Sequence, residues 1–203
     1  GQLYLIGVQG EIGPQVLALV QETQAGAVIL MGPRNQGVAS TRAATDELVE
    51  AAGPQAALIV ATDQEGGLVQ RLSGPGFSTI PPAATQASYQ PDELRRSWQG
   101  WGAELSAAGV RLNLAPVVDV VPAEFAASNE PISRLERGYG DTADKVTASS
   151  AAVIRGMQDV GVASSAKHFP GIGRTTTNTD LGIAHDTVTT GTADELAAFR
   201  GAI

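Results

Sequence analysis

Short apolar runs alternate along this chain with longer stretches in which apolar residues recur at helical spacing. The runs predict strands, and the stretches between and after them predict helices. The runs are apolar along most of their length, which is typical of strands buried on both faces of a parallel sheet. The predicted strands are 3–8, 27–31, 56–62, 110–121 and 163–169, and the predicted helices are 11–24, 41–52, 91–108, 143–160 and one from about 193.

This order repeats a βα unit five times and predicts an α/β fold with helices covering a parallel sheet. Two architectures fit the pattern: an open doubly wound sheet, or part of a (β/α)8 barrel. Gly7-Val8-Gln9-Gly10 lacks the third glycine of a dinucleotide-binding loop, which counts against a dinucleotide fold. No linker or internal repeat is evident, so residues 1–203 are interpreted as one domain.

Composition and charge exclude several classes of function. Hydrophobic residues make up 43% of the 203 residues, enough for a core. The net charge of −8, without runs of Lys or Arg, argues against nucleic acid and membrane-surface partners. The absence of Cys excludes disulfides and thiol chemistry, and two His cannot build a three-His metal site. No apolar stretch reaches the roughly 18 residues of a membrane span.

Charged residues gather at the carboxyl ends of the predicted strands. Asp63 and Glu65 follow the third strand, Asp119 closes the fourth, and Lys167 and His168 close the fifth. This edge of an α/β sheet is where ligands bind. Lys167 is expected to pair with Asp63 or Asp119, because a buried charge needs a partner. The same groups could also form charge-assisted hydrogen bonds to the hydroxyls of a sugar, and the two interpretations are compatible.

Four segments stand at or just after these strand ends: DQEGGLVQR at 63–71, NLAPVVDV at 113–120, RGYG at 137–140 and KHFPG at 167–171. They resemble, in this order, the DQEGGxVxR, N-x-A-P-V-x-D, R-x-[FY]-G and KHFPG motifs of family 3 glycoside hydrolases. The resemblance is strongest to the bacterial β-N-acetylglucosaminidase branch. Asn35 also falls where that family has an asparagine. Each motif alone is weak, but four in order make the resemblance specific.

The resemblance implies a TIM-type (β/α)8 barrel, of which this chain carries the first five βα units. It implies a retaining exo-β-N-acetylglucosaminidase that hydrolyses GlcNAc-containing glycans, such as peptidoglycan fragments. It also implies that five residues hold the sugar next to the scissile bond: Asp63, Arg71, Arg137, Lys167 and His168. The cationic groups would donate hydrogen bonds and Asp63 would accept them. Asp119 is expected to orient Lys or Arg from behind.

The loop after KHFPG departs from the family pattern. In the related branch, an Asp-Ser-His ending supplies the acid/base dyad, whereas here Asn178 stands at the Asp position and Asp180 at the His position. Asn cannot transfer a proton, so Asp180 is the candidate acid/base, provided its pKa is raised; otherwise it is a loop or cap residue. His185 is the alternative acid/base, or else a surface histidine.

The catalytic nucleophile is expected outside this chain. A retaining mechanism needs a second carboxylate about 5–5.5 Å from the first. In the family the nucleophilic Asp follows a later strand, downstream of KHFPG. Five βα units do not close an eight-stranded barrel, so a longer chain or a second chain is expected to complete it.

Two alternatives stay open: a catalytically inactive sugar-binding module, and a β-glucosidase of the same family. KHFPG and DQEGG are more typical of the N-acetylglucosaminidase branch. No metal or organic cofactor is expected, because carboxylates carry the reaction. The chain begins at Gly1, so its start does not indicate a compartment. Its composition favours export from a high-GC Gram-positive bacterium, with a cytoplasmic location as the alternative.

Overall fold

The computed structural model describes residues 2–189 and 196–202. Within these ranges, five parallel strands form one sheet in the order β1-β2-β3-β6-β7. The order of the strands in the sheet is the same as their order along the chain, so each new strand is added at the same edge. Its strands are β1 (Leu5–Gln9), β2 (Ala27–Met31), β3 (Ile59–Thr62), β6 (Leu112–Asn113) and β7 (Ala163–Ser164).

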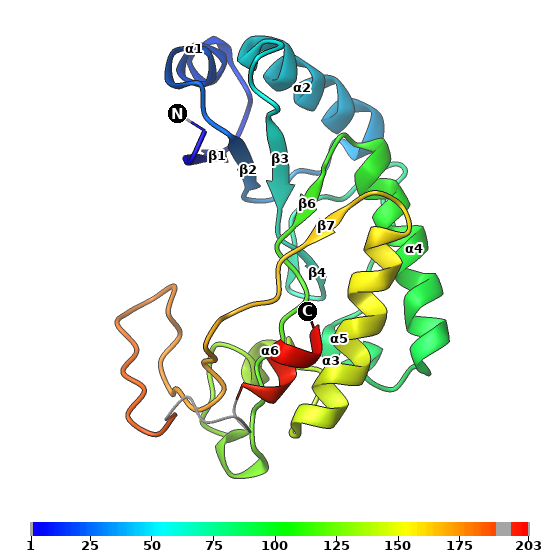
Figure 1. Cartoon of the computed structure of the whole chain (residues 1–203), viewed down its shortest axis with the longest axis vertical. Coiled ribbons are helices and arrows are strands. Elements are labelled where there is room, and N and C mark those ends of the chain that lie inside the picture. The colour runs from blue at the N-terminus through cyan, green and yellow to red at the C-terminus, as the bar shows by residue number, and fades with distance from the viewer. Residues whose placement is uncertain (1, 190–195, 203) are drawn as a thin grey trace.

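Long helices follow the strands and lie along the outer side of the curved sheet (Figure 1). They are α1 (Pro14–Thr23), α2 (Gly37–Ala52), α4 (Pro91–Ala107) and α5 (Ala143–Gln158), with the short α6 (Ala197–Ala202) packed on α5. Proline opens α1 and α4, where its missing N–H costs nothing. The predicted α/β fold with a parallel sheet is confirmed. Within the described ranges, no helix has the length and hydropathy of a bilayer-spanning segment.

The strands predicted at 110–121 and 163–169 are much shorter than expected, because the structure has regular strand only over β6 and β7. The ladder in 110–121 is regular only over β6, because Pro116 lacks the N–H that a central strand must donate. The segment nevertheless continues beside the chain that follows β7. Lys167 N–H donates to Pro116 O at 3.2 Å, and Val118 N–H donates to Lys167 O at 2.7 Å. The two segments therefore stay together up to the charged residues at their ends.

An antiparallel hairpin that the sequence did not predict follows β3. It consists of β4 (Gln64–Gly66) and β5 (Val69–Gln70). Its turn uses Gly66, whose φ of +100° disfavours other residues. A Cβ on Gly66 would lie 2.4 Å from Pro81 O, so the segment leading to the short helix α3 (Ala83–Gln86) packs directly on the turn. The loop 122–142 carries the 3₁₀ helices η1 (Ala123–Phe125) and η2 (Ser133–Leu135).

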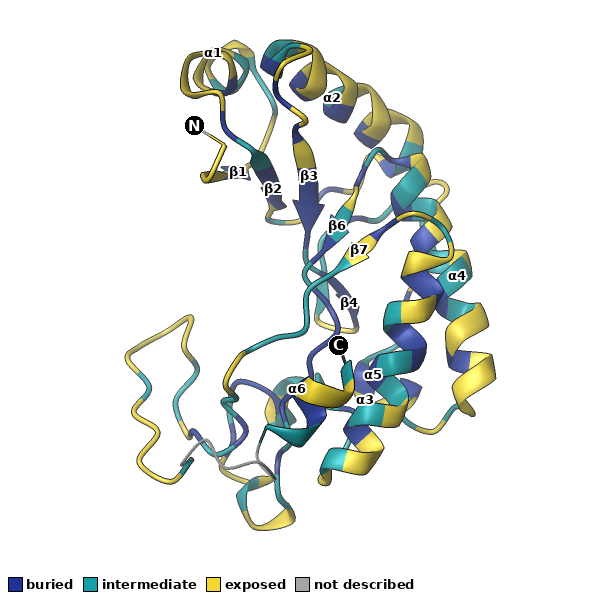
Figure 2. Cartoon of the chain, in the orientation of Figure 1, coloured by how far each residue is buried: buried dark blue, intermediate teal, exposed yellow. Residues whose placement is uncertain are grey.

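The helices bury one face of the sheet more completely than the other. Val8, Leu30 and Val60 face the helical layer and are almost fully buried. Side chains that alternate with them project from the opposite face, and at its amino-terminal end Leu5 and Ile59 are 48% and 44% exposed. Figure 2 shows this difference as exposed ribbon on the upper part of β3. The apolar sheet is thus covered from one side by the described residues.

Helices α4 and α5 approach each other through a glycine, which yields a first prediction. A Cβ on Gly156 would lie 2.6 Å from Arg95 O and 2.7 Å from Trp98 Cβ. Gly156→Ala should therefore lower the free energy of unfolding by about 1–3 kcal/mol through overpacking. Gly100, on α4, has no atom within 4 Å of its Cβ position, so Gly100→Ala should raise stability by up to about 1 kcal/mol. Urea unfolding of both variants checks this, and equal effects would contradict the close packing.

Candidate functional site

The charged residues at the carboxyl ends of β3 and β7 meet as an ion-paired cluster. Lys167 Nζ lies 2.6 Å from Asp63 Oδ1 and 2.7 Å from Glu65 Oε1, and its side chain is 15% exposed. Asp63 and Glu65 are two residues apart in extended chain, so their side chains point the same way and reach one amine. The predicted pairing of Lys167 with Asp63 is confirmed.

Glu65 is shared between two cations. Its carboxylate also accepts two parallel hydrogen bonds from Arg137, Nε to Oε2 and Nη2 to Oε1, both at 2.8 Å. This bidentate geometry is the strong form of a charge-assisted pair. Burial alone would raise the pKa of Glu65, whose side chain is 4% exposed, but the hydrogen bond from Arg137 and the charge of Lys167 outweigh it. The pKa of Glu65 is thereby held below its usual value.

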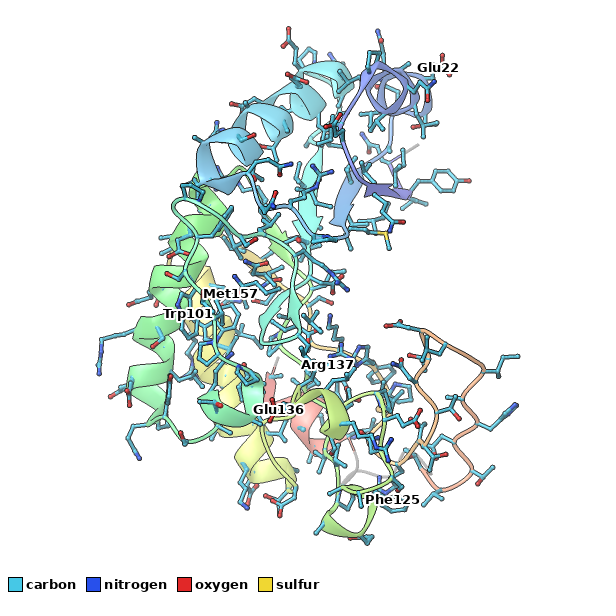
Figure 3. All side chains as sticks on the ribbon, turned by 180° about the vertical axis from the view of Figure 1, so that it is seen from behind. Glu22, Trp101, Phe125, Glu136, Arg137 and Met157 are labelled. Atoms are coloured by element: carbon cyan, nitrogen blue, oxygen red, sulfur yellow. The ribbon has the colours of Figure 1, made fainter. Side chains whose placement is uncertain are left out.

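Arg137 is fixed from several sides. Burial alone would lower its pKa, but the hydrogen bonds and charge of Glu65 outweigh burial, and the charges of Asp119 and Asp180 add to the effect, so the pKa of Arg137 is raised. Its Nη1 also donates to Pro131 O at 2.8 Å. Figure 3 shows Arg137 near the middle of the molecule, whereas Phe125 of the same loop lies at its lower end.

Asp119 is fully buried and fixes His168. Its Oδ2 lies 2.7 Å from His168 Nδ1 and accepts from the His168 backbone N–H at 3.2 Å, while its Oδ1 accepts from Ile172 N–H at 2.8 Å. Because a carboxylate only accepts, Nδ1 carries the proton, and Nε2 can accept from Arg137 Nη2 at 3.3 Å. Asp119 was predicted to orient Lys or Arg, but its hydrogen bonds go to His168 and Ile172 instead. It acts on Arg137 only through its charge and through the His168 ring.

Arg71, Asp180 and His185 make no hydrogen bond or ion pair to this cluster within the part of the chain that the structure describes. Arg71 follows β5 and is half-buried, and its guanidinium makes no hydrogen bond within residues 2–189 and 196–202. Asp180 is exposed on the loop after KHFPG, where its backbone N–H donates to Asn178 Oδ1 at 3.0 Å. Its charge still acts on Arg137. His185 is exposed further along the same loop.

Glu65 is the residue that sequence reasoning missed. It stood in the DQEGG segment but was given no role, although its two-residue spacing from Asp63 was a usable signal. The part of the chain that the structure describes contains no group of three or more His, Asp or Glu side chains placed to hold a metal ion.

The lowered pKa of Glu65 predicts a pH-dependent contribution to stability. A carboxyl group with a lowered pKa in the folded state stabilises the fold above its unfolded pKa of about 4.3, and this stabilisation is lost as the pH falls through the folded pKa. Glu65→Gln should therefore destabilise the protein most at pH 7 and progressively less as the pH is lowered below about 4. Thermal unfolding across this range tests it, with exposed Glu50→Gln as the control. A difference that does not change with pH would contradict the paired carboxylate.

Comparisons with known proteins show which family this chain belongs to. The family model described as "Glycosyl hydrolase family 3 N terminal domain" matches residues 1–203. A beta-hexosaminidase of Vibrio cholerae is 35% identical over 205 residues, covering 100% of this chain and 59% of that relative. The chain thus spans about three fifths of the length of this curated relative.

Two solved structures are also similar to this chain. The crystal structure of a beta-N-acetylhexosaminidase from Beutenbergia cavernae matches with a TM-score of 0.93 and 42% identity, over 98% of this chain and 61% of that one. A glycoside hydrolase family 3 beta-N-acetylglucosaminidase from Paenibacillus sp. matches with a TM-score of 0.83 and 32% identity, over 100% of this chain and 39% of that one. With motifs, fold and cluster in agreement, the chain belongs to the glycosyl hydrolase family 3 N-terminal domain family.

Proposed function

We propose that this chain supplies the sugar-binding part of the active site of a retaining exo-β-N-acetylglucosaminidase. The observation that carries the proposal is the cluster in which Lys167 and Arg137 share the buried carboxylate of Glu65 at the carboxyl edge of the sheet. The names of the relatives, beta-hexosaminidase and beta-N-acetylglucosaminidase, support the reaction and the sugar.

The cluster suits the polar groups of a neutral sugar. Lys167 carries three donors, two of which are directed to Asp63 and Glu65, so one can bond to a hydroxyl. Asp63 accepts from Lys167 through one oxygen and can accept from hydroxyls through the other. Arg71, whose guanidinium has no hydrogen-bond partner in the described ranges, can donate to hydroxyl or acetamido oxygens. His168, held by Asp119, would complete the wall of the subsite beside Arg137.

The five strands are proposed to be the first part of a (β/α)8 barrel. The exposed side chains of Leu5, Met31 and Ile59 lie on the sheet face opposite the helices, where the interior of a closed barrel would bury them. The remaining strands would come from a longer chain or from a second chain. That the relatives extend well beyond the matched region supports the first source.

Acid/base catalysis is proposed for Asp180. Its loop leaves the cluster at KHFPG, and its charge contributes to the raised pKa of Arg137, which supports the proposal. His185 is the alternative, while His168 has its two ring nitrogens directed to Asp119 and Arg137. The nucleophile would be an Asp outside residues 1–203. GlcNAc-containing glycans such as peptidoglycan fragments are the proposed substrates, and the proposed reaction needs no cofactor because carboxylates carry it.

An inactive sugar-binding module is the second candidate, because Asn178 occupies the expected acid position. Such a module would bind N-acetylglucosamine without turning over a glycoside. A β-glucosidase would instead cleave the glucoside in preference to the N-acetylglucosaminide.

The substrate assay separates these candidates. The full-length gene product should hydrolyse 4-nitrophenyl N-acetyl-β-D-glucosaminide faster than the matching β-glucoside. Lys167→Met should lower kcat/KM roughly tenfold to a hundredfold, since it removes a charged donor. Lys145 is an exposed lysine, so Lys145→Met is the control and should change kcat/KM far less. Binding of N-acetylglucosamine with no turnover would instead favour the inactive module.

Replacement of the proposed acid tests the catalytic loop separately. Asp180→Asn should lower kcat by about 10²–10⁴-fold, the usual contribution of a general acid or base. The carboxylate of Asp46 is exposed on α2, so Asp46→Asn should leave kcat unchanged. Steady-state kinetics on the nitrophenyl substrate measure the two variants. Full activity of Asp180→Asn, with a loss in His185→Gln, would transfer the role to His185.

A further inference from the structure

One buried amide side chain joins three segments of the fold behind the cluster. Gln86, the last residue of α3, is fully buried. Its Oε1 accepts from Trp98 Nε1 at 2.9 Å and from the Tyr139 hydroxyl at 2.8 Å. Its Nε2 donates to Glu65 O at 3.1 Å and to Pro81 O at 2.7 Å. Both donors and both acceptor sites of the amide are therefore used.

Two of these partners belong to the backbone segments that carry the cluster. The carbonyl that accepts from Gln86 is that of Glu65 itself, and Tyr139 lies two residues after Arg137. The same helix makes a second link, because Ala84 N–H donates to Glu136 O at 3.1 Å. The segments on either side of the Glu65–Arg137 ion pair are thus tied to one short helix.

The third partner ties this assembly to the helical layer. Trp98 is fully buried on α4 and packs edge-to-face against Trp101, with ring centroids 5.3 Å apart. Burial raises the pKa of Tyr139 far above its usual range, so its hydroxyl remains a donor to Gln86. Gln86 therefore links helix α4 to the backbone of Glu65 and to Tyr139, two residues after Arg137.

We propose that Gln86 is a positioning residue of the sugar-binding site, which sets the distance and orientation between Glu65 and Arg137. A bidentate pair depends on the relative position of both backbone segments, and a misplacement of about 1 Å can cost on the order of 10²-fold in rate. The expected effect of Gln86 on the reaction rate rests on the proposed function. Its expected effect on the Glu65–Arg137 ion pair does not depend on that function.

Gln86→Met tests it, because Met keeps the length and loses all four hydrogen bonds. In the full-length protein, below its unfolding temperature, kcat/KM for the N-acetylglucosaminide should fall by tenfold or more. Thr45→Val is the matched control: Thr45 is equally buried and its Oγ1 donates to Ala108 O at 2.9 Å, away from the cluster. Thr45→Val should lower the melting temperature but change kcat/KM by less than twofold.

A second variant applies if Gln86→Met does not fold. Gln86→Glu keeps both acceptor sites for Trp98 and Tyr139 but, when ionised, cannot donate to Glu65 O. Protonation of the introduced carboxyl restores one donor, and burial raises its pKa. The activity of Gln86→Glu relative to wild type should therefore rise as the pH is lowered from 8 to 5. The same ratio for Thr45→Val should stay constant.

A spectroscopic measurement separates failure of this inference from failure of the proposed function. The ¹⁵N–¹H signal of Arg137 Nε, assigned by its loss in Arg137→Lys, reports the hydrogen bond to Glu65 whether or not the protein is active. Gln86→Met or Gln86→Glu at pH 8 should shift or broaden this signal, and Thr45→Val should not. An unchanged Arg137 signal, with kinetics like those of Thr45→Val, would overturn the inference. An inactive wild type with a shifted signal would overturn the proposed reaction alone.

Discussion

The site depends on the ion pairs that the buried carboxylate of Glu65 makes with Lys167 and Arg137. Left alone, a carboxylate so far from water would be protonated or excluded from the fold. Two cations, Lys167 and Arg137, hold it ionised from different segments of the chain. Lys167 and Arg137 are also proposed to contact the sugar. The ion pairs with Glu65 that stabilise the cluster therefore also fix the positions of two sugar-binding side chains.

The fold brings these groups together through the direction of its strands. Parallel strands end at the same edge, so residues that follow β3 and β7 become neighbours although they lie about a hundred positions apart in sequence. The hairpin β4–β5 turns Glu65 towards Lys167, and the loop before α5 adds Arg137 from outside the sheet. Asp119, after β6, then fixes His168 and the start of the following loop. Each contributing segment is anchored by backbone bonds as well as by its charge.

Much of this arrangement could be predicted from the sequence, and the rest could not for identifiable reasons. Periodicity and motif order predicted the α/β fold with a parallel sheet and named Asp63 as one of two possible partners of Lys167, because these follow from local pattern and a shared sheet edge. The length of the strand at 110–121 was overestimated, because its apolar content was given more weight than Pro116, which cannot donate to a ladder. The partner of Asp119 depends on the side-chain direction in an irregular segment, which no periodicity encodes. The role of Glu65 could be inferred in part from its spacing to Asp63, but its pairing with Arg137 depends on a loop that periodicity does not place.

The central claim is that a sugar binds to Lys167, Asp63 and Arg137, and that Glu65 holds the two cations in position. A crystal structure of the full-length protein with N-acetylglucosamine tests it most directly. The account predicts sugar hydroxyl or acetamido oxygens within about 2.7–3.2 Å of Lys167 Nζ and of an Arg137 or Asp63 side-chain atom, with the Glu65–Arg137 pair intact. A sugar bound elsewhere, or a Lys167 turned away from Glu65 in the complex, would contradict it.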